Sequence, residues 1–286
     1  MDFQCKITAG HFFALGCPCE VLVDSTDRYL AETLVKLARE EAWRIEKKWS
    51  RYLPNSMIEK INRSAGSPIT VDDETARMIT FSESLHKLSD GIFDITSGVL
   101  RKVWNFNPGS KLPSQSEIET VMSNVGWGRV HWQSPIIRMG AGMQLDFGGT
   151  GKEYAVDQCL KILADFGEAV LVNFGGDLAC TGAPRNSEGW LVGIDASEQM
   201  IILSQGAIAS SGDTYRYLEH QGKRYSHILD ARTGWPVDDS PASVTVLADT
   251  CTTAGMLSTL ALTQGANAER FLREQSVKYF IDRTFH

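Results

Sequence analysis

The hydrophobic positions of the chain recur with a helical period in several stretches. After Leu30, apolar residues follow at intervals of three and four positions as far as Trp49, which places them on one face of an amphipathic helix. A second such stretch ends near Leu88 and has an aspartate, Asp72 or Asp73, in position to cap its start. The predicted helices cover residues 30–49, 73–88, 154–166, 253–263 and 267–273.

Short apolar runs between these helices have the length and composition of β-strands. Residues 50–66 have loop chemistry followed by a short turn, and residues 121–147 are typical of short strands joined by tight turns. Helices and strands mix without a regular βαβα alternation, and no linker divides the chain, so we expect an α+β fold in which residues 1–286 form one interlocked unit with mixed or antiparallel sheets. Strands are expected at 19–25, 169–173, 191–194, 201–203, 243–248 and 279–281.

Composition and charge exclude several classes of protein. The chain of 286 residues is 43% hydrophobic and 22% charged, which is ordinary for a globular protein. A net charge of −7 and a pI of about 5.4 argue against a nucleic-acid partner. No apolar run approaches the roughly 18 residues that a membrane span needs, so no membrane span is expected.

Cysteine usage and the N-terminal residues predict a cytoplasmic protein. The six cysteines contain no CxxC pair, which disfavours a zinc site, and we expect reduced thiols. The N-terminal residues lack the basic start and long apolar core of a signal peptide, and Cys5 lies too near the start for a lipid-modified cysteine. A leader trimmed from this sequence stays an alternative.

The stretch LDFGGTGKEYAVD, residues 145–157, has the order strand, glycine turn and helix. This order presents free backbone N–H groups and the positive end of a helix dipole to an anion. It is not a P-loop, because Asp146 occupies the position of the required glycine and Glu153 follows Lys152. Alone, the stretch fits an anion site and a structural turn equally well.

Three further stretches contain residues that could carry chemistry. In residues 172–182, two glycines precede Asp177, which either points into a functional region or is a solvated acid at a β-turn. In residues 224–237, His227 is either a general base or a hydrogen-bonded structural residue. In residues 249–262, hydroxyl side chains gather near the start of a predicted helix, where they could simply cap it and bond back within it.

In order along the chain, these stretches resemble the ApbE-type FAD:protein FMN transferases. The resemblance runs from about Phe13 to Leu272. It implies an enzyme that splits FAD with Mg²⁺ and transfers FMN to a Ser or Thr hydroxyl of an acceptor flavoprotein, releasing AMP. The motifs that carry it are LGC (15–17), WSRYLPNSMIEKIN (49–62), DGIFDITSGVLRKVWNF (90–106), LDFGGTGKEYAVD (145–157), VNFGGD (172–177), SSGD (210–213) and SHILDARTGWPV (226–237).

The resemblance also implies roles for particular residues. His227 would be the catalytic base beside the phosphates, and a metal ion would be contacted by the Gly149 backbone and by Thr259. The implied FAD contacts are Leu15, Tyr52, Ile92, Phe93, Asp94, Asp146, Lys152 and Ile228.

The chain departs from the family pattern at positions that bear on the metal. Gly255 stands where the family places an aspartate that binds the metal, four residues before Thr259, and Glu153 stands where a glycine is usual. An aspartate at position 255 would project beside Thr259, so we expect Gly255→Asp to strengthen Mg²⁺ binding; Asp249 is the nearest acid in sequence that could substitute. Two alternatives to the transferase stay open: a non-catalytic FAD-binding relative that stores, senses or delivers flavin, and an FAD pyrophosphatase.

Overall fold

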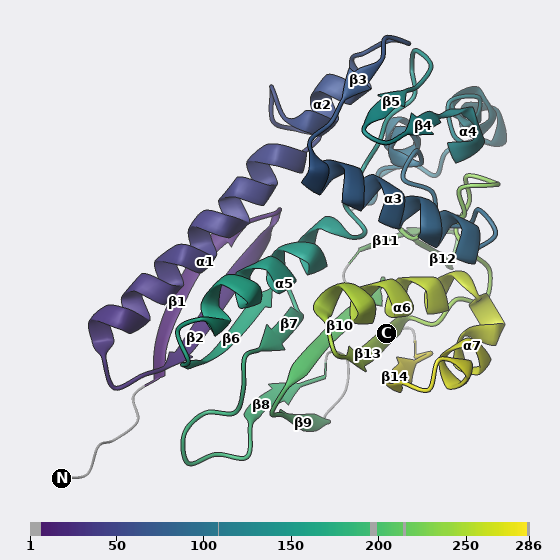
Figure 1. Ribbon diagram of the computed structural model, residues 1–286. Coiled ribbons are helices and arrows are strands. Elements are labelled where there is room, and N and C mark those ends of the chain that lie inside the picture. Colours follow the sequence, from purple (N-terminus) through teal and green to yellow (C-terminus); the bar gives the residue numbers. More distant parts are fainter. Residues whose placement is uncertain (1–6, 108, 195–198, 214–215, 285–286) are drawn as a thin grey trace.

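The computed structural model describes residues 7–107, 109–194, 199–213 and 216–284, so Cys5 lies outside the described residues (Figure 1). Its centre is a seven-stranded sheet in which every neighbouring pair is antiparallel. In spatial order the strands are β1 (Ile7–Ala14), β2 (Cys17–Asp24), β6 (Ala169–Phe174), β7 (Asp177–Cys180), β10 (Gly206–Gly212), β13 (Ser243–Ala248) and β14 (Lys278–Asp282).

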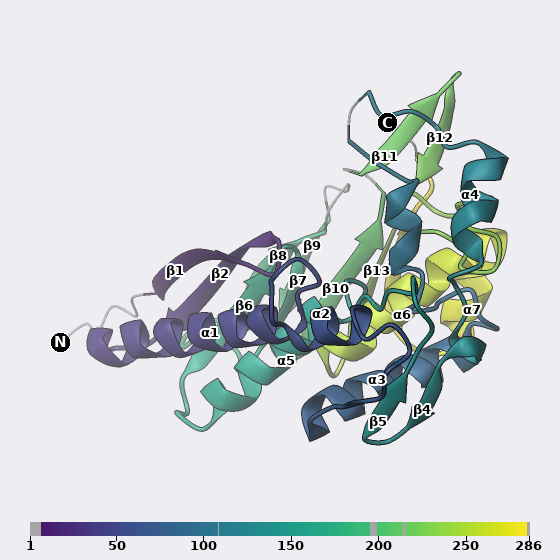
Figure 2. The ribbon, with the colours of Figure 1, turned by 90° about the horizontal axis from the view of Figure 1, so that it is seen from above.

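Three helices cover one face of this sheet (Figures 1 and 2). They are α1 (Arg28–Trp49), α5 (Gly151–Ala164) and α6 (Cys251–Thr263). The apolar stripe of α1 packs on the sheet, and the Asp27 side chain caps its first turn by accepting hydrogen bonds from two backbone N–H groups. The helix α6 is buried on nearly all sides because α5 and the short α7 (Ala268–Glu274) enclose it together with the sheet.

The opposite face of the sheet carries a hairpin of β8 (Trp190–Gly193) and β9 (Met200–Leu203). Trp190, Val192 and Leu203 of the hairpin pack on Leu171, Leu178 and Ile208 of the sheet. Both faces of the central strands are therefore covered, which explains their near-continuous apolar sequence.

A second group of elements lies mostly at the end of the molecule away from β1 and β2, on the right of Figure 2. The segment 224–237 packs through Tyr225, Ala231 and Trp235 against Leu100 and Trp104, and this contact brings two distant parts of the chain together. The elements are α2 (Met57–Asn62), β3 (Ile69–Thr70), α3 (Asp73–Leu88), η1 (Gly98–Lys102), α4 (Gln115–Met122), η2 (Trp127–Arg129), β4 (His131–Gln133), β5 (Ile136–Arg138), β11 (Tyr217–His220) and β12 (Lys223–Ser226); η3 (Gly265–Asn267) precedes α7.

The α+β expectation is confirmed, and all five predicted helices are present within a few residues of their expected bounds. Residues 50–66 differ, because Ser56 caps a helix there, α2. Strands β1, β3, β7, β10, β11 and β12 were not predicted, because β3 has only two residues and small or polar residues fill many positions of the others. Among the described residues, no helix has the length and apolar character that crossing a membrane requires.

Candidate active site

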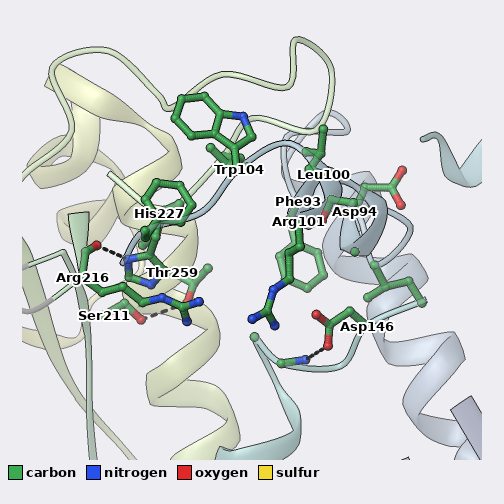
Figure 3. Close-up of a pocket in the computed structure, with 18 of the residues that line it drawn as sticks. Phe93, Asp94, Leu100, Arg101, Trp104, Asp146, Ser211, Arg216, His227 and Thr259 are labelled. Atoms are coloured by element: carbon green, nitrogen blue, oxygen red, sulfur yellow. Dashed lines mark hydrogen bonds between the residues drawn. The ribbon is translucent and has the colours of Figure 1, made fainter. Parts of the chain in front are cut away.

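A cavity of about 740 Å³ opens between the sheet with its helices and the second group of elements. This size is within the range of small-molecule and cofactor sites. Figure 3 shows Ser211, Arg216, His227 and Thr259 on one side of the cavity, with Phe93, Arg101 and Asp146 facing them across it.

The N-terminus of α5 points into this cavity, because Gly148, Gly149, Lys152 and Glu153 all line it. Thr150 begins the helix without a capping hydrogen bond from its side chain. The preceding turn is held by Asp146, whose Oδ1 accepts a hydrogen bond from the Gly148 backbone N–H at 2.9 Å. An uncapped helix start leaves backbone donors free for an anion.

Lys152 forms a buried ion pair with Asp177 at the floor of the cavity. The Lys152 Nζ lies 2.7 Å from Asp177 Oδ2, and the Ser210 backbone N–H donates to Asp177 Oδ1 at 3.1 Å. Burial disfavours the ammonium charge, but the carboxylates of Asp177 and Glu153 outweigh it and raise the pKa of Lys152 above its usual value. Asp177 is 2% exposed, so the alternative of a solvated acid at a β-turn is wrong.

Glu153 is the second buried acid at this point. It is 7% exposed, and within the described part of the chain its Oε2 atom has no hydrogen-bond partner. Burial raises the pKa of Glu153 to about 8, with a smaller contribution from Asp177 and opposition from Lys152. The side chain packs against Gly255, where an added Cβ would lie 2.5 Å from Glu153 Cγ.

Hydroxyl groups of β10 and α6 line the neighbouring surface. Ser211 Oγ lies 2.9 Å from Thr259 Oγ1 and 2.8 Å from Ser258 Oγ. Ser258 also bonds back to the Gly255 carbonyl, whereas Thr259 lines the cavity. The predicted cluster of hydroxyls is thus only partly a capping feature, and Thr250 is the residue that caps α6.

His227 lies in the cavity wall with one defined ring hydrogen bond. Its Nδ1 is 2.9 Å from the Arg216 carbonyl oxygen, which can only accept, so Nδ1 carries the proton. The tautomer leaves a lone pair on Nε2. Burial lowers the pKa of His227 to about 4, and the nearby Arg216 charge adds to this shift. The histidine is therefore neutral near pH 7 and can accept a proton through Nε2.

The segment 92–94 lines the cavity as expected, but the Asp94 carboxylate is used within the fold. Asp94 Oδ1 accepts from Thr96 and Oδ2 accepts from the Trp127 backbone N–H, each at 2.7 Å. The Ile92 carbonyl accepts from Ala231 N at 3.0 Å, which ties the segment to residues 224–237. Asp94 therefore stabilises the backbone of this cavity wall through hydrogen bonds within the fold.

The structure brings most of the predicted site residues into one cavity. Its lining includes Ile92, Phe93, Asp94, Asp146, Gly149, Lys152, His227, Ile228 and Thr259. Leu15 and Tyr52 lie outside that lining. The Leu15 backbone N–H donates to Glu46 Oε1 at 2.9 Å, and Tyr52, 66% exposed, stacks beside Arg51 and Arg101.

Several cavity residues were not singled out from the sequence. Arg101 and Arg216 are cationic, and Trp104 stacks on Phe106 with ring centroids 5.3 Å apart. Arg101 and the two aromatic residues belong to the motif at 90–106, whose alternation of basic and aromatic residues was the available signal. Ser211 belongs to the motif at 210–213, whereas Arg216 lies outside the motifs and had no comparable signal.

The donors at the cavity floor suit a hard divalent cation. Within the described residues, no group of three or more His, Cys, Asp and Glu side chains could hold a metal ion. Glu153, Asp177 and Thr259 nevertheless offer oxygen atoms, and Mg²⁺ takes oxygen ligands and shares its sphere with substrate phosphates. The orphaned Oε2 of Glu153 fits such an ion. Asp249 is exposed and outside the cavity lining, so it does not substitute for the missing aspartate.

The chain is similar in sequence to a known protein family and to named proteins of other organisms. A sequence model of the ApbE family matches residues 1–281. A protein of Chlamydia pneumoniae named FAD:protein FMN transferase is 31% identical over 249 residues, covering 84% of this chain and 79% of the relative. A protein of Escherichia coli K12 with the same name is 28% identical over 252 residues, covering 81% and 71%.

Two solved structures have the same fold over nearly the whole chain. The ApbE protein of Thermotoga maritima superimposes with a TM-score of 0.87 at 30% identity and covers 96% of this chain and 94% of its own. The flavinyl transferase ApbE of Pseudomonas stutzeri, in its apo form, gives a TM-score of 0.88 at 26% identity and covers 100% and 94%.

Proposed function

We propose that this enzyme, which belongs to the ApbE family, transfers the FMN part of FAD to a hydroxyl group of an acceptor flavoprotein and releases AMP. The observation that carries the proposal is that a neutral histidine with a lone pair on Nε2 and an uncapped, cationic helix start share one cavity. Attack of a hydroxyl on a phosphate needs both a base and a site for the phosphate charge. The relatives named FAD:protein FMN transferase support the choice of substrate.

The cavity has complementary surfaces for the two halves of FAD. Phe93 and Phe106 offer aromatic faces for flat rings, and the buried Trp104 supports Phe106 from behind by stacking on it. Lys152, Arg101 and the backbone N–H groups at the start of α5 offer positive charge and donors for the pyrophosphate. Ile92 and Ile228 close the apolar edges. Leu15 and Tyr52 contact FAD only if the ligand extends beyond the cavity as it stands.

Glu153, Asp177, Thr259 and the Gly149 backbone are the groups that would hold Mg²⁺. When bound, the ion would neutralise charge on the pyrophosphate as the P–O bond breaks. Burial raises the pKa of Asp177, and Lys152 opposes this rise and holds the carboxyl group in place through their 2.7 Å ion pair. Asp146 accepts from the Gly148 backbone N–H and so holds the glycine turn, which keeps the neighbouring Gly149 backbone in position.

His227 is the proposed base for the acceptor hydroxyl, which the family resemblance suggests to be a Ser or Thr side chain. The Arg216 carbonyl fixes the proton on Nδ1, so Nε2 can remove the hydroxyl proton as oxygen attacks phosphorus. The FMN phosphate then joins the acceptor oxygen and AMP leaves with the electrons of the broken P–O bond. Water in place of the acceptor would give the pyrophosphatase reaction.

A direct assay tests the proposal. Purified protein is incubated with FAD, Mg²⁺ and a candidate acceptor, and both AMP release and covalent flavin fluorescence of the acceptor in a gel are followed. AMP and flavin-labelled acceptor in equal amounts are expected. Free FMN with AMP would identify a pyrophosphatase. FAD binding without turnover, with several acceptors and with Mg²⁺ or Mn²⁺, would favour a flavin storage or delivery protein.

A further inference from the structure

Glu153 is a buried carboxylate that the fold itself does not use. It is 7% exposed and lines the cavity, and among the described residues its Oε2 atom has no hydrogen-bond partner. A first-turn acid that only serves the helix dipole gains by lying at the surface, where water solvates its charge. Nor does an ion pair explain Glu153, because the Lys152 Nζ is 2.7 Å from Asp177.

The opposite helix leaves room for this side chain at one position. An added Cβ at Gly255 would meet Glu153 Cγ at 2.5 Å and both Cδ and Oε1 at 3.0 Å. Real Cβ atoms do not approach so closely, so any larger residue at 255 would push Glu153 out of place. Glycine is a poor helix former, yet it lies in the middle of α6 where Glu153 reaches across.

Oxygen donors of other elements line the same part of the cavity. Thr259 lies one helical turn after Gly255 on α6, and Asp177 comes from β7. Carboxylate and hydroxyl oxygens suit Mg²⁺ or Mn²⁺ and do not suit softer metals. An unpartnered buried carboxylate beside such donors is thus more readily explained by a cation than by packing.

We propose that Glu153 is the carboxylate ligand of the divalent cation in this cavity, and that Gly255 is kept without a side chain to admit it. The carboxylate thereby reaches the cation from α5 instead of α6. Positions 153 and 255, two of those at which the chain departs from the motifs it resembles, are in direct contact, so we interpret them as one exchange of a carboxylate between the two helices. This inference rests on the proposed function, because the cation is the one that would bind with FAD.

Binding of Mn²⁺ to the FAD-loaded protein, measured by electron paramagnetic resonance of the free ion, tests the inference without any need for turnover. Wild type should bind one Mn²⁺, and Glu153→Gln, which keeps the shape and removes the charge, should weaken binding by at least about tenfold. The matched control is Asp165→Asn, which removes one exposed charge at the opposite, C-terminal end of the same helix. Its Mn²⁺ affinity should stay within about twofold of wild type.

The exchange variant Glu153→Gly with Gly255→Asp provides the second arm. It moves the carboxylate back to α6, so Mn²⁺ affinity should recover to within a few fold of wild type, whereas Glu153→Gly alone should stay weak. Gly255→Asp alone should weaken Mn²⁺ binding, since the new side chain collides with Glu153; this reverses the expectation drawn from the sequence. Circular dichroism melting curves check that each variant folds.

The outcomes separate this inference from the proposed function. Equal Mn²⁺ affinity in wild type and Glu153→Gln, or no Mn²⁺ bound by wild type with FAD, overturns the role of Glu153, even if FMN transfer proceeds. Conversely, Mn²⁺ binding that depends on Glu153 but yields no labelled acceptor and no AMP leaves the metal ligand in place and removes the transferase.

Discussion

The wall of the cavity formed by β7, β10, α5 and α6 is polar and tightly bonded, whereas the wall formed by residues 92–107 is aromatic and carries an exposed arginine. In the first wall, Lys152 and Asp177 pair at 2.7 Å and Ser211 bonds Thr259 at 2.9 Å. In the second, Trp104 stacks on Phe106, and Arg101 lies against an exposed Tyr52. Buried, mutually bonded groups keep fixed positions, as chemistry requires, while stacking surfaces tolerate adjustment, as ligand entry requires.

The comparison predicts that a single substitution in the polar wall causes a large loss of both stability and activity. Lys152→Met leaves the buried Asp177 without its paired cation, so unfolding free energy should drop by about 3–5 kcal/mol. FMN transfer should fall by a hundredfold or more, because a positioned donor to the phosphates is lost. Urea denaturation and the labelled-acceptor assay measure the two effects, with the exposed Lys161→Met on the same helix as control.

A double variant separates these two effects. Lys152→Met with Asp177→Asn removes both charges of the pair and should recover most of the stability while staying inactive. Full activity in the double variant would show that Lys152 serves only the fold.

His227 lies beside Phe106 of the aromatic wall. Its removal should lower the rate of FMN transfer more than the affinity for FAD. His227→Ala should lower kcat about a hundredfold or more, the usual contribution of a positioned base, and change FAD affinity by no more than a few fold. Single-turnover transfer and FAD fluorescence titration give these values, and His220→Ala, exposed on the neighbouring strand, is the control. Equal losses in rate and affinity would make His227 a ligand contact.

The sequence anticipated the polar wall better than the aromatic one. Glycine turns followed by a helix are local patterns, so spacing alone marked residues 145–157 as either an anion site or a structural turn. The meeting of residues 90–106 with 224–237 depends on long-range packing of Leu100, Trp104 and Trp235, which periodicity does not reveal. The burial of Glu153 against Gly255 likewise required the position of α6 relative to α5.

A substitution in the aromatic wall should have a moderate effect, and mainly on FAD affinity. Arg101→Ala removes one cation from the ligand side of the cavity, and FAD affinity should fall about tenfold, the size of one charge-assisted hydrogen bond. The difference from wild type should shrink as salt rises, because the side chain is partly exposed to solvent. Fluorescence titration at two ionic strengths measures this, with the exposed Arg270→Ala as control. An unchanged affinity at low salt would remove Arg101 from phosphate binding.

The smallest expected effect is the part of the pH dependence of stability that comes from the half-buried His227. Burial lowers the pKa of His227 to about 4 from the ordinary 6.5, so below pH 6.5 the unfolded chain takes up a proton that the folded chain does not. Stability from this group is therefore complete above pH 6.5 and is lost as pH falls toward 4. Partial exposure limits the loss to about 1–3 kcal/mol. Comparing urea midpoints of wild type and His227→Ala at pH 7 and pH 5 isolates it, since the variant should lose less stability on acidification. The same shift means that His227 itself should add no inflection to kcat/KM between pH 8 and pH 5.5, because this base stays unprotonated there. A midpoint near pH 6.5 in that profile would mean that water solvates His227 in the working enzyme. The part of the cavity around His227 would then adjust during turnover, as is expected of the aromatic wall.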